Sequence, residues 1–77
     1  MKINIKYFGQ IAEVTNRDSE IIEVTAKTIS DLTDWIYLKY PDLKNKDFKI
    51  AQNQELTTNE TPITGDELAL LPPFAGG

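Results

Sequence analysis

Apolar and polar positions alternate at the start of the chain. Over residues 2–8 the odd positions are apolar and the even positions are polar, apart from Phe8. This period of two predicts a half-buried strand whose odd positions face the core. Phe8 then lies on the otherwise polar face. Gly9 ends the strand, and residues 10–18 form a connection with room for a short helical turn.

One helix is predicted in the middle of the chain, after a second strand over the β-branched residues 20–25 that can pair antiparallel with the first. Thr28 is a good N-cap for this helix, and Asp31 completes a weaker form of the capping box. Apolar residues then recur at helical spacing on one face, at Ile29, Leu32, Ile36 and Tyr40. Pro41 ends the helix. Leu38 falls nearly opposite the apolar face, where we expect only the following loop to cover it.

The C-terminal half of the chain predicts shorter strands. They cover residues 48–52, residues 55–57 and residues 67–71. Loops are predicted at residues 42–47 and 58–62, and a turn at residues 53–54. The last strand is apolar at consecutive positions, which is typical of a central strand buried on both sides. Leu68 and Leu70 should face the core, with Ala69 and Leu71 on the opposite face.

The order of these elements is ββαβ(β)β, with a strand–helix–strand crossover and a central final strand. It favours an α+β fold of the β-grasp type, a mixed sheet of four or five strands with one main helix packed across one face. Half of a ferredoxin-like fold, or another small α+β fold, would give a similar pattern. We expect residues 1–71 to form the domain and residues 72–77 to form a flexible, extended tail.

Composition excludes most catalytic chemistry. The 77 residues include no cysteine and no histidine, so the chain has no thiol nucleophile, no imidazole base and no usual zinc ligand set; we expect no metal site. The acidic pairs Asp66/Glu67 and Asp18/Glu20 fit turns and solvated faces better than a catalytic acid and base. A net charge of −4 argues against nucleic acid as a partner. No apolar run approaches the roughly 18 residues of a membrane span, so we expect no membrane contact and a cytoplasmic location.

The C-terminus departs from an ordinary frayed end. It reads Leu71-Pro72-Pro73-Phe74-Ala75-Gly76-Gly77. The prolines stop the last strand, because each lacks the N–H that a sheet needs. Two consecutive glycines arise by chance at a given place in roughly one chain in 200, and the residues before them stay apolar where frayed ends are usually polar. This composition favours a functional tail.

Four stretches, taken in order, carry a resemblance to a known family. They are Lys6-Tyr7-Phe8-Gly9, the helix pattern Leu32-x-x-x-Ile36-x-x-x-Tyr40-Pro41, the turn Gly65-Asp66-Glu67, and the ending from Leu71 to Gly77. Together they resemble the small subunit of molybdopterin synthase, a ubiquitin-like β-grasp sulfur carrier. The Pro-Pro-x-x-Gly-Gly terminus with the turn upstream of it is the most specific part. The chain departs from many relatives at Ala12-Glu13 and Asn16-Arg17, where they carry an Arg-Glu pair and a glycine.

The resemblance implies a two-stage sulfur chemistry at the carboxyl of Gly77. An E1-like enzyme would adenylate this carboxyl with ATP, and a sulfur donor such as a cysteine desulfurase or a rhodanese-like protein would convert it to a thiocarboxylate. The large subunit, in a heterotetramer of two small and two large subunits, would use the sulfur to form the dithiolene of molybdopterin from cyclic pyranopterin monophosphate. The chain would bind no cofactor and would supply no catalytic side chain.

The resemblance also implies how the chain meets its partner. The residues inserted into the large subunit would be Pro72, Pro73, Phe74, Ala75 and Gly76. The prolines keep the stem extended and the glycines fit a narrow channel. Phe8 and Leu71, which parity places on the non-core face of neighbouring strands, would form an apolar docking patch beside the tail, with Leu56 joining from the short hairpin.

Other functions of the same ending stay open. A sulfur carrier for thiamin thiazole formation or for tRNA thiolation would share the Gly-Gly end and its activation, although the Leu-Pro-Pro-Phe stem favours the molybdopterin branch. A ubiquitin-like modifier would use the same carboxyl to form isopeptide bonds with lysines. A plain interaction domain with an incidental tail is the remaining alternative.

Overall fold

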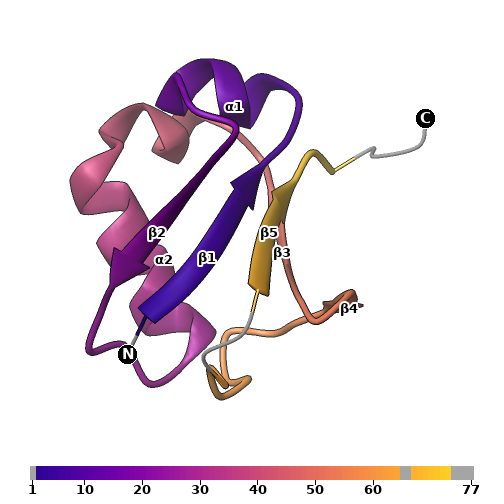
Figure 1. Ribbon diagram of the computed structural model, residues 1–77. Coiled ribbons are helices and arrows are strands. Elements are labelled where there is room, and N and C mark those ends of the chain that lie inside the picture. The colour runs from indigo at the N-terminus through magenta and orange to yellow at the C-terminus, as the bar shows by residue number, and fades with distance from the viewer. Residues whose placement is uncertain (1, 65–66, 74–77) are drawn as a thin grey trace.

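The computed structural model describes residues 2–64 and 67–73, which form one mixed five-stranded sheet with helices on one face (Figure 1). The elements are β1 (Lys2–Tyr7), α1 (Gln10–Thr15), β2 (Ser19–Glu23), α2 (Ile29–Lys39), the 3₁₀ helix η1 (Pro41–Asn45), β3 (Lys49–Gln52), β4 (Glu55–Leu56) and β5 (Glu67–Leu71). The strand order is β2-β1-β5-β3-β4. β1 and β5 are parallel and the other neighbours are antiparallel. The central β5 and the single main helix confirm the predicted β-grasp architecture.

The core lies between the sheet and α2. The side chains with no exposed surface include Ile3, Ile5, Leu32, Ile36, Leu68 and Leu70. These are the positions that alternation in the strands and helical spacing in α2 predicted to face inward, so both patterns are confirmed. Among the described residues, every buried side-chain nitrogen or oxygen has a hydrogen-bond partner. The core therefore holds no unused polar group that a ligand would have to satisfy.

α2 begins as the sequence predicts. The Thr28 hydroxyl accepts a hydrogen bond from the Asp31 N–H at 3.3 Å, and the Asp31 carboxylate accepts one from the Thr28 N–H at 3.3 Å. This reciprocal capping box satisfies two N–H groups at the start of the helix. α2 ends at Lys39, two residues before Pro41. The helix thus has a fixed beginning and end, both set by local sequence.

The prediction of a charged loop over residues 42–47 is wrong for residues 42–45. Pro41–Asn45 form η1, and its Leu43 is fully buried. The Leu43 N–H donates to the Tyr40 carbonyl at 3.0 Å, and the Lys46 N–H donates to the Leu43 carbonyl at 3.1 Å. One apolar residue among charged ones has no period, so the pattern of the sequence could not indicate that it is a core residue.

The following loop does not cover Leu38, contrary to prediction, and this side chain is 84% exposed. η1 packs against α1 and the end of α2. It therefore directs Leu43 into the core and leaves the outer face of α2 open. A single exposed leucine is common in soluble domains and needs no partner to explain it.

The remaining boundaries differ from prediction by one or two residues. The strand predicted over residues 20–25 ends at Glu23, the one over 48–52 begins at Lys49, and the one over 55–57 ends at Leu56. The helical turn expected within residues 10–18 is α1. The predicted turn is confirmed at Asn53 and Gln54, whose φ values of 53° and 70° are those of the two-residue turn that matches the twist of a hairpin.

Candidate functional site

The face of the sheet opposite α2 carries small side chains at its centre. The register pairs Lys6 of β1 with Ala69 of β5, and Ala69 with Ala51 of β3. Ala51 is paired in turn with Leu56 of β4. Residues paired across neighbouring strands lie on the same face. The two middle members of this row are alanines, and the outer two are the longer Lys6 and Leu56. The centre of the face is therefore recessed between longer side chains.

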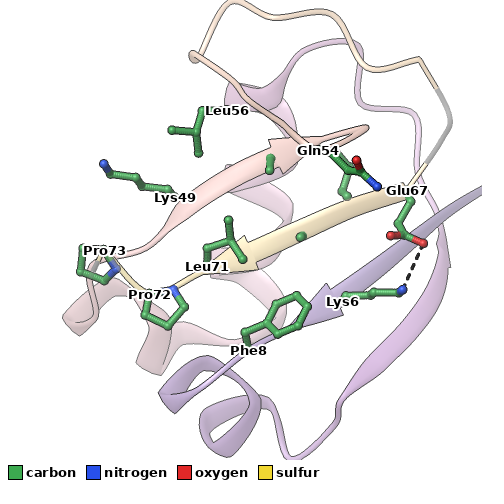
Figure 2. Close-up of a pocket in the computed structure, with 12 residues that line it drawn as sticks. Lys6, Phe8, Lys49, Gln54, Leu56, Glu67, Leu71, Pro72 and Pro73 are labelled. Carbon is green, nitrogen blue, oxygen red and sulfur yellow. Dashed lines mark ion pairs between the residues drawn. The ribbon is translucent and has the colours of Figure 1, made fainter. Parts of the chain in front are cut away.

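A hollow of about 510 Å³ lies over this row, and we call it the open-face hollow. Its apolar lining includes Phe8, Ala51, Leu56, Ala69, Leu71 and Pro72. Phe8 is 44% exposed and Leu56 is 64% exposed. Figure 2 shows Leu71 between Phe8 and Leu56. The structure therefore brings all three residues of the predicted docking patch to one surface.

Charged side chains stand around the open-face hollow. Lys6 and Glu67 form an ion pair of 3.3 Å whose side chains are about half exposed, so water weakens it to about 0–1 kcal/mol. Lys49 is paired in register with Leu71, and within the described residues it has no ion-pair partner. These lysines were not among the predicted site residues. The alternation of the two strands places both on this face and could have identified them.

The predicted tail begins at the edge of the hollow. β5 ends at Leu71, and Pro72 and Pro73 both line the hollow (Figure 2). The other predicted tail residues, at positions 74–77, lie outside the described residues. The structure thus places Pro72 and Pro73 at the hollow. The tail itself and the roles assigned to it and to the docking patch stay predictions.

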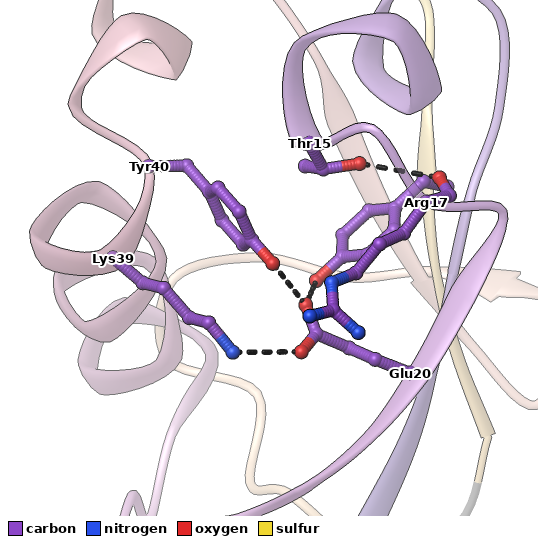
Figure 3. Close-up of polar contacts among 6 residues, drawn as sticks. Thr15, Arg17, Glu20, Lys39 and Tyr40 are labelled. Atoms are coloured by element: carbon purple, nitrogen blue, oxygen red, sulfur yellow. Dashed lines mark hydrogen bonds and ion pairs between the residues drawn. The ribbon is translucent and has the colours of Figure 1, made fainter.

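A cluster of polar side chains surrounds Glu20 of β2, where β1 and β2 meet the end of α2 (Figure 3). The Glu20 carboxylate accepts hydrogen bonds of 2.5 Å from the phenols of Tyr7 and Tyr40. Its other oxygen lies 2.8 Å from the ammonium group of Lys39. The Glu20 side chain is only 7% exposed, so the prediction that it lies on a solvated face is wrong. The reason is that its three donors come from β1, α2 and the residue after α2, which no local pattern shows.

The electrostatics of this cluster indicate a structural role. Burial alone would raise the pKa of Glu20, but the hydrogen bonds from Lys39, Tyr40 and Tyr7 outweigh burial and hold that pKa below its usual value. Burial and the bonds to Glu20 raise the pKa of the Tyr7 and Tyr40 phenols. The bond to Glu20 likewise raises the pKa of Lys39. A carboxylate held ionised by three donors is a fixed acceptor and is poorly suited to transferring protons.

Within the described residues, neither a metal site nor a membrane-spanning helix is present. No group of acidic side chains in residues 2–64 and 67–73 is arranged to hold a metal ion. None of the helices described is long and apolar enough to cross a membrane. The predicted functional residues that the structure describes all line the open-face hollow, where the predicted tail begins.

Comparisons with known proteins agree with this geometry. The model of the ThiS family matches residues 5–77. The molybdopterin synthase sulfur carrier subunit of Mycobacterium tuberculosis is 34% identical over 82 residues, which cover 100% of this chain and 99% of the relative. The resemblance stated from the sequence is therefore confirmed by a match over essentially the whole of both chains.

Two solved structures show similar folds at full coverage of both chains. SAMP1 from Haloferax volcanii, a small archaeal modifier protein, has 26% identity and a TM-score of 0.79, with 100% of each chain covered. A complex of subunits 1 and 2 of the molybdopterin-converting factor from Helicobacter pylori contains a chain with 31% identity and a TM-score of 0.70, again with 100% of each chain covered. The chain therefore belongs to the ThiS family, with the sulfur-carrier subunits of molybdopterin synthase among its relatives.

Proposed function

We propose that this chain is the sulfur-carrier subunit of a molybdopterin synthase and that it carries sulfur on the C-terminal carboxyl of Gly77. The observation that carries the proposal is the position of the tail root, since Pro72 and Pro73 leave the sheet at the edge of an exposed apolar hollow. A domain that delivers its own terminus into a partner needs a docking surface beside that terminus. Similarity to a sulfur carrier subunit along the whole chain supports the same conclusion.

The chemistry begins with activation of the terminal carboxyl. Its unperturbed pKa of about 3.3–3.7 leaves it ionised and unreactive toward nucleophiles at neutral pH. In an E1-like enzyme, a carboxylate oxygen of Gly77 attacks the α-phosphate of ATP and expels pyrophosphate. The persulfide of a donor protein, such as a cysteine desulfurase or a rhodanese-like protein, then displaces AMP. A thiol cleaves the resulting acyl disulfide and leaves the thiocarboxylate. The activating enzyme uses the ATP, so this chain binds no cofactor, and ATP use fits a cytoplasmic location.

Sulfur transfer takes place in the large subunit. The thiocarboxylate sulfur attacks a carbon of cyclic pyranopterin monophosphate and displaces an oxygen substituent of that carbon. Water then cleaves the acyl–sulfur bond, which leaves the sulfur on the pterin and restores the Gly77 carboxylate. A dithiolene contains two sulfurs, so two loaded carriers are consumed for each product. This stoichiometry fits a heterotetramer of two small and two large subunits. The Helicobacter pylori complex of subunits 1 and 2 supports a large subunit as the partner.

The docking patch binds the large subunit, and the tail enters its active site. Phe8, Leu56 and Leu71 bind an apolar surface of the large subunit, because the open-face hollow leaves them accessible in the free chain. The six residues from Pro72 to Gly77 reach at most about 20 Å when extended. That length is enough to cross from a docked domain into a buried site, with Phe74 as the apolar anchor and Ala75 and Gly76 passing the narrow channel.

A ubiquitin-like protein modifier is the second candidate function, favoured by the likeness to SAMP1. A modifier would use the same adenylated Gly77, but a lysine amine would attack it in place of sulfur. Carriers for thiamin thiazole formation or tRNA thiolation would share the chemistry as far as the thiocarboxylate. The reactions after activation therefore distinguish the three possibilities.

The decisive experiment follows the mass of the intact chain. Incubation with its cognate E1-like enzyme, ATP and sulfur donor should replace one terminal oxygen by sulfur, and the loaded chain should yield molybdopterin from the pyranopterin precursor when the large subunit is added. A chain lacking Gly77 should fold equally well by circular dichroism and fail at both steps. Conjugates linked to lysines, or molybdopterin formation by the shortened chain, would overturn the proposal.

A further inference from the structure

Gly9, between β1 and α1, has a backbone conformation that other residues rarely adopt. Its φ and ψ angles are 57° and −132°, a region open almost only to glycine because a Cβ atom would collide with the neighbouring backbone. Gly9 directly follows Phe8, the aromatic residue at the margin of the open-face hollow. The chain therefore makes a glycine-dependent turn at the corner of the predicted docking surface.

The space beside Gly9 is filled by the first residue of the tail. A Cβ atom at position 9 would lie 2.9 Å from Cγ of Pro72 and 4.0 Å from its Cδ. The nearer contact is too short for two carbon atoms, and Cγ belongs to a closed ring that cannot rotate away as the end of a long side chain can. The missing side chain of Gly9 is thus a notch that holds the Pro72 ring.

Hydrogen bonding between β1 and β5 ends at the same corner. The Phe8 N–H donates to the Leu70 carbonyl at 3.3 Å. In a parallel pair the next bond would run from the N–H of residue 72 to the Phe8 carbonyl. Pro72 has no N–H, and the Phe8 carbonyl instead accepts from the Ile11 N–H at 3.1 Å. Beyond Leu70, no hydrogen bond among the described residues holds β5 to β1. The next contact between the two segments is the packing of Pro72 against Gly9.

We propose that Gly9 is a positioning residue for the carrier tail: the notch holds the Pro72 ring and so sets the direction in which the tail leaves the domain. The consecutive residues Phe8 and Gly9 then have separate roles, the first binding the partner and the second aiming the tail. Pro72, the first residue of the predicted tail, is therefore held in a fixed position beside the docking surface. This role deepens the proposed sulfur transfer and rests on it for its biological meaning, although the direction of the tail can be measured without it.

The first test measures tail direction in the free chain. The protein contains no cysteine, so Leu38→Cys and Ala75→Cys provide two specific sites for spin labels, and pulsed electron resonance gives the distribution of distances between them. Gly9→Ala should shift or broaden this distribution. The control is Asn16→Ala, which places alanine at the other end of α1 at a φ of 59°, in the left-handed region and away from the residues that line the open-face hollow. The strain there is smaller than at Gly9, so this control tests only whether an alanine at positive φ beside α1 alters the distribution. It should leave the distribution unchanged.

The second test measures sulfur transfer in a single turnover, with thiocarboxylated chain and saturating large subunit. Gly9→Ala should lower the rate at saturation by roughly tenfold or more, since a displacement of about 1 Å can cost a hundredfold. The dissociation constant of the docked complex should change by less than about threefold, because the patch is intact. Combining Gly9→Ala with Pro72→Ala should cause no further loss beyond the larger single effect, since both changes remove one contact.

Each outcome decides the proposal. An unchanged distance distribution in Gly9→Ala, a wild-type rate at saturation, a loss confined to the dissociation constant, or additive effects of the two substitutions would overturn it. If Gly9→Ala does not fold, Pro72→Ala empties the notch without straining residue 9, and an unchanged distance distribution in that variant would overturn it equally. A wild-type chain that loads and transfers no sulfur would refute the proposed function, while the distance measurement would still decide the role of Gly9.

Discussion

Tyr40, the residue that follows α2, donates a hydrogen bond of 2.5 Å to the carboxylate of Glu20 on β2. Tyr7 of β1 donates to the same oxygen, and Lys39 donates to the other. The two tyrosine rings meet edge to face with their centroids 6.1 Å apart. The Glu20 carboxylate thus connects the end of α2 to the paired strands β1 and β2. Since Tyr7 directly precedes Phe8, the same cluster stabilises the strand end that carries the predicted docking patch.

Glu20→Gln should lower the free energy of unfolding by about 1–3 kcal/mol. The amide is a weaker acceptor than the carboxylate, and its NH₂ group would face either the Lys39 ammonium or the two phenols, which donate to the carboxylate in the wild type. Glu23→Gln is the matched control, because Glu23 is exposed on the same strand and forms no ion pair with the described residues; it should change stability by less than about 0.5 kcal/mol. Urea denaturation followed by Trp35 fluorescence measures both, and equal losses would contradict a structural role for Glu20.

The pH dependence of stability should also depend on Glu20. Its pKa lies below the usual 4.5, so the folded state binds fewer protons than the unfolded state in acid, and stability should fall as the pH drops below about 4.5. At high pH, Tyr7, Tyr40 and Lys39 have raised pKa values, so stability should fall again above about pH 10. Urea unfolding at a series of pH values should show both slopes reduced in Glu20→Gln; slopes equal to those of the wild type would refute this assignment.

Alternation and helical spacing were sufficient to predict most of the fold. They identified the inward faces of β1, β5 and α2, because burial on one face of a regular element leaves a period in the sequence. The same parity placed Phe8 and Leu71 on the open face. η1 and the environment of Glu20 could not be predicted in this way. Leu43 and Glu20 are single residues whose burial depends on elements distant in sequence.

Leu43→Ala should be strongly destabilising, by about 2–5 kcal/mol. Leu43 has no exposed surface, and the alanine would leave a cavity where η1 closes the core. Leu38→Ala removes the same atoms from a side chain that is 84% exposed, and should change stability by less than about 0.5 kcal/mol. Thermal and urea unfolding compare the two. A small effect at Leu43 would show that η1 is peripheral, as the sequence alone suggested.

The candidate site was predictable to a similar extent, and for related reasons. The tail was visible because proline pairs and terminal glycines are local signals that need no partner in the fold. The contact between Gly9 and Pro72 was not, since it depends on parallel pairing of the first and last strands and on the backbone angles of one glycine. Strand parity alone places Lys49 on the same surface. Only the structure shows that Lys49 has no ion-pair partner among the described residues.

Phe8→Ala should weaken binding to the large subunit without unfolding the carrier. Its ring is 44% exposed in the free chain and lines the open-face hollow, and truncating an aromatic residue of this kind at an interface typically costs about 1–2 kcal/mol, or roughly 5- to 30-fold in affinity. Ile21→Ala is the matched control, because Ile21 is 72% exposed and is paired with Asn4 on the same face but does not line the hollow. Calorimetric titration of the large subunit with each variant measures the difference. Equal affinities for the two variants would show that the hollow is not part of the docking surface.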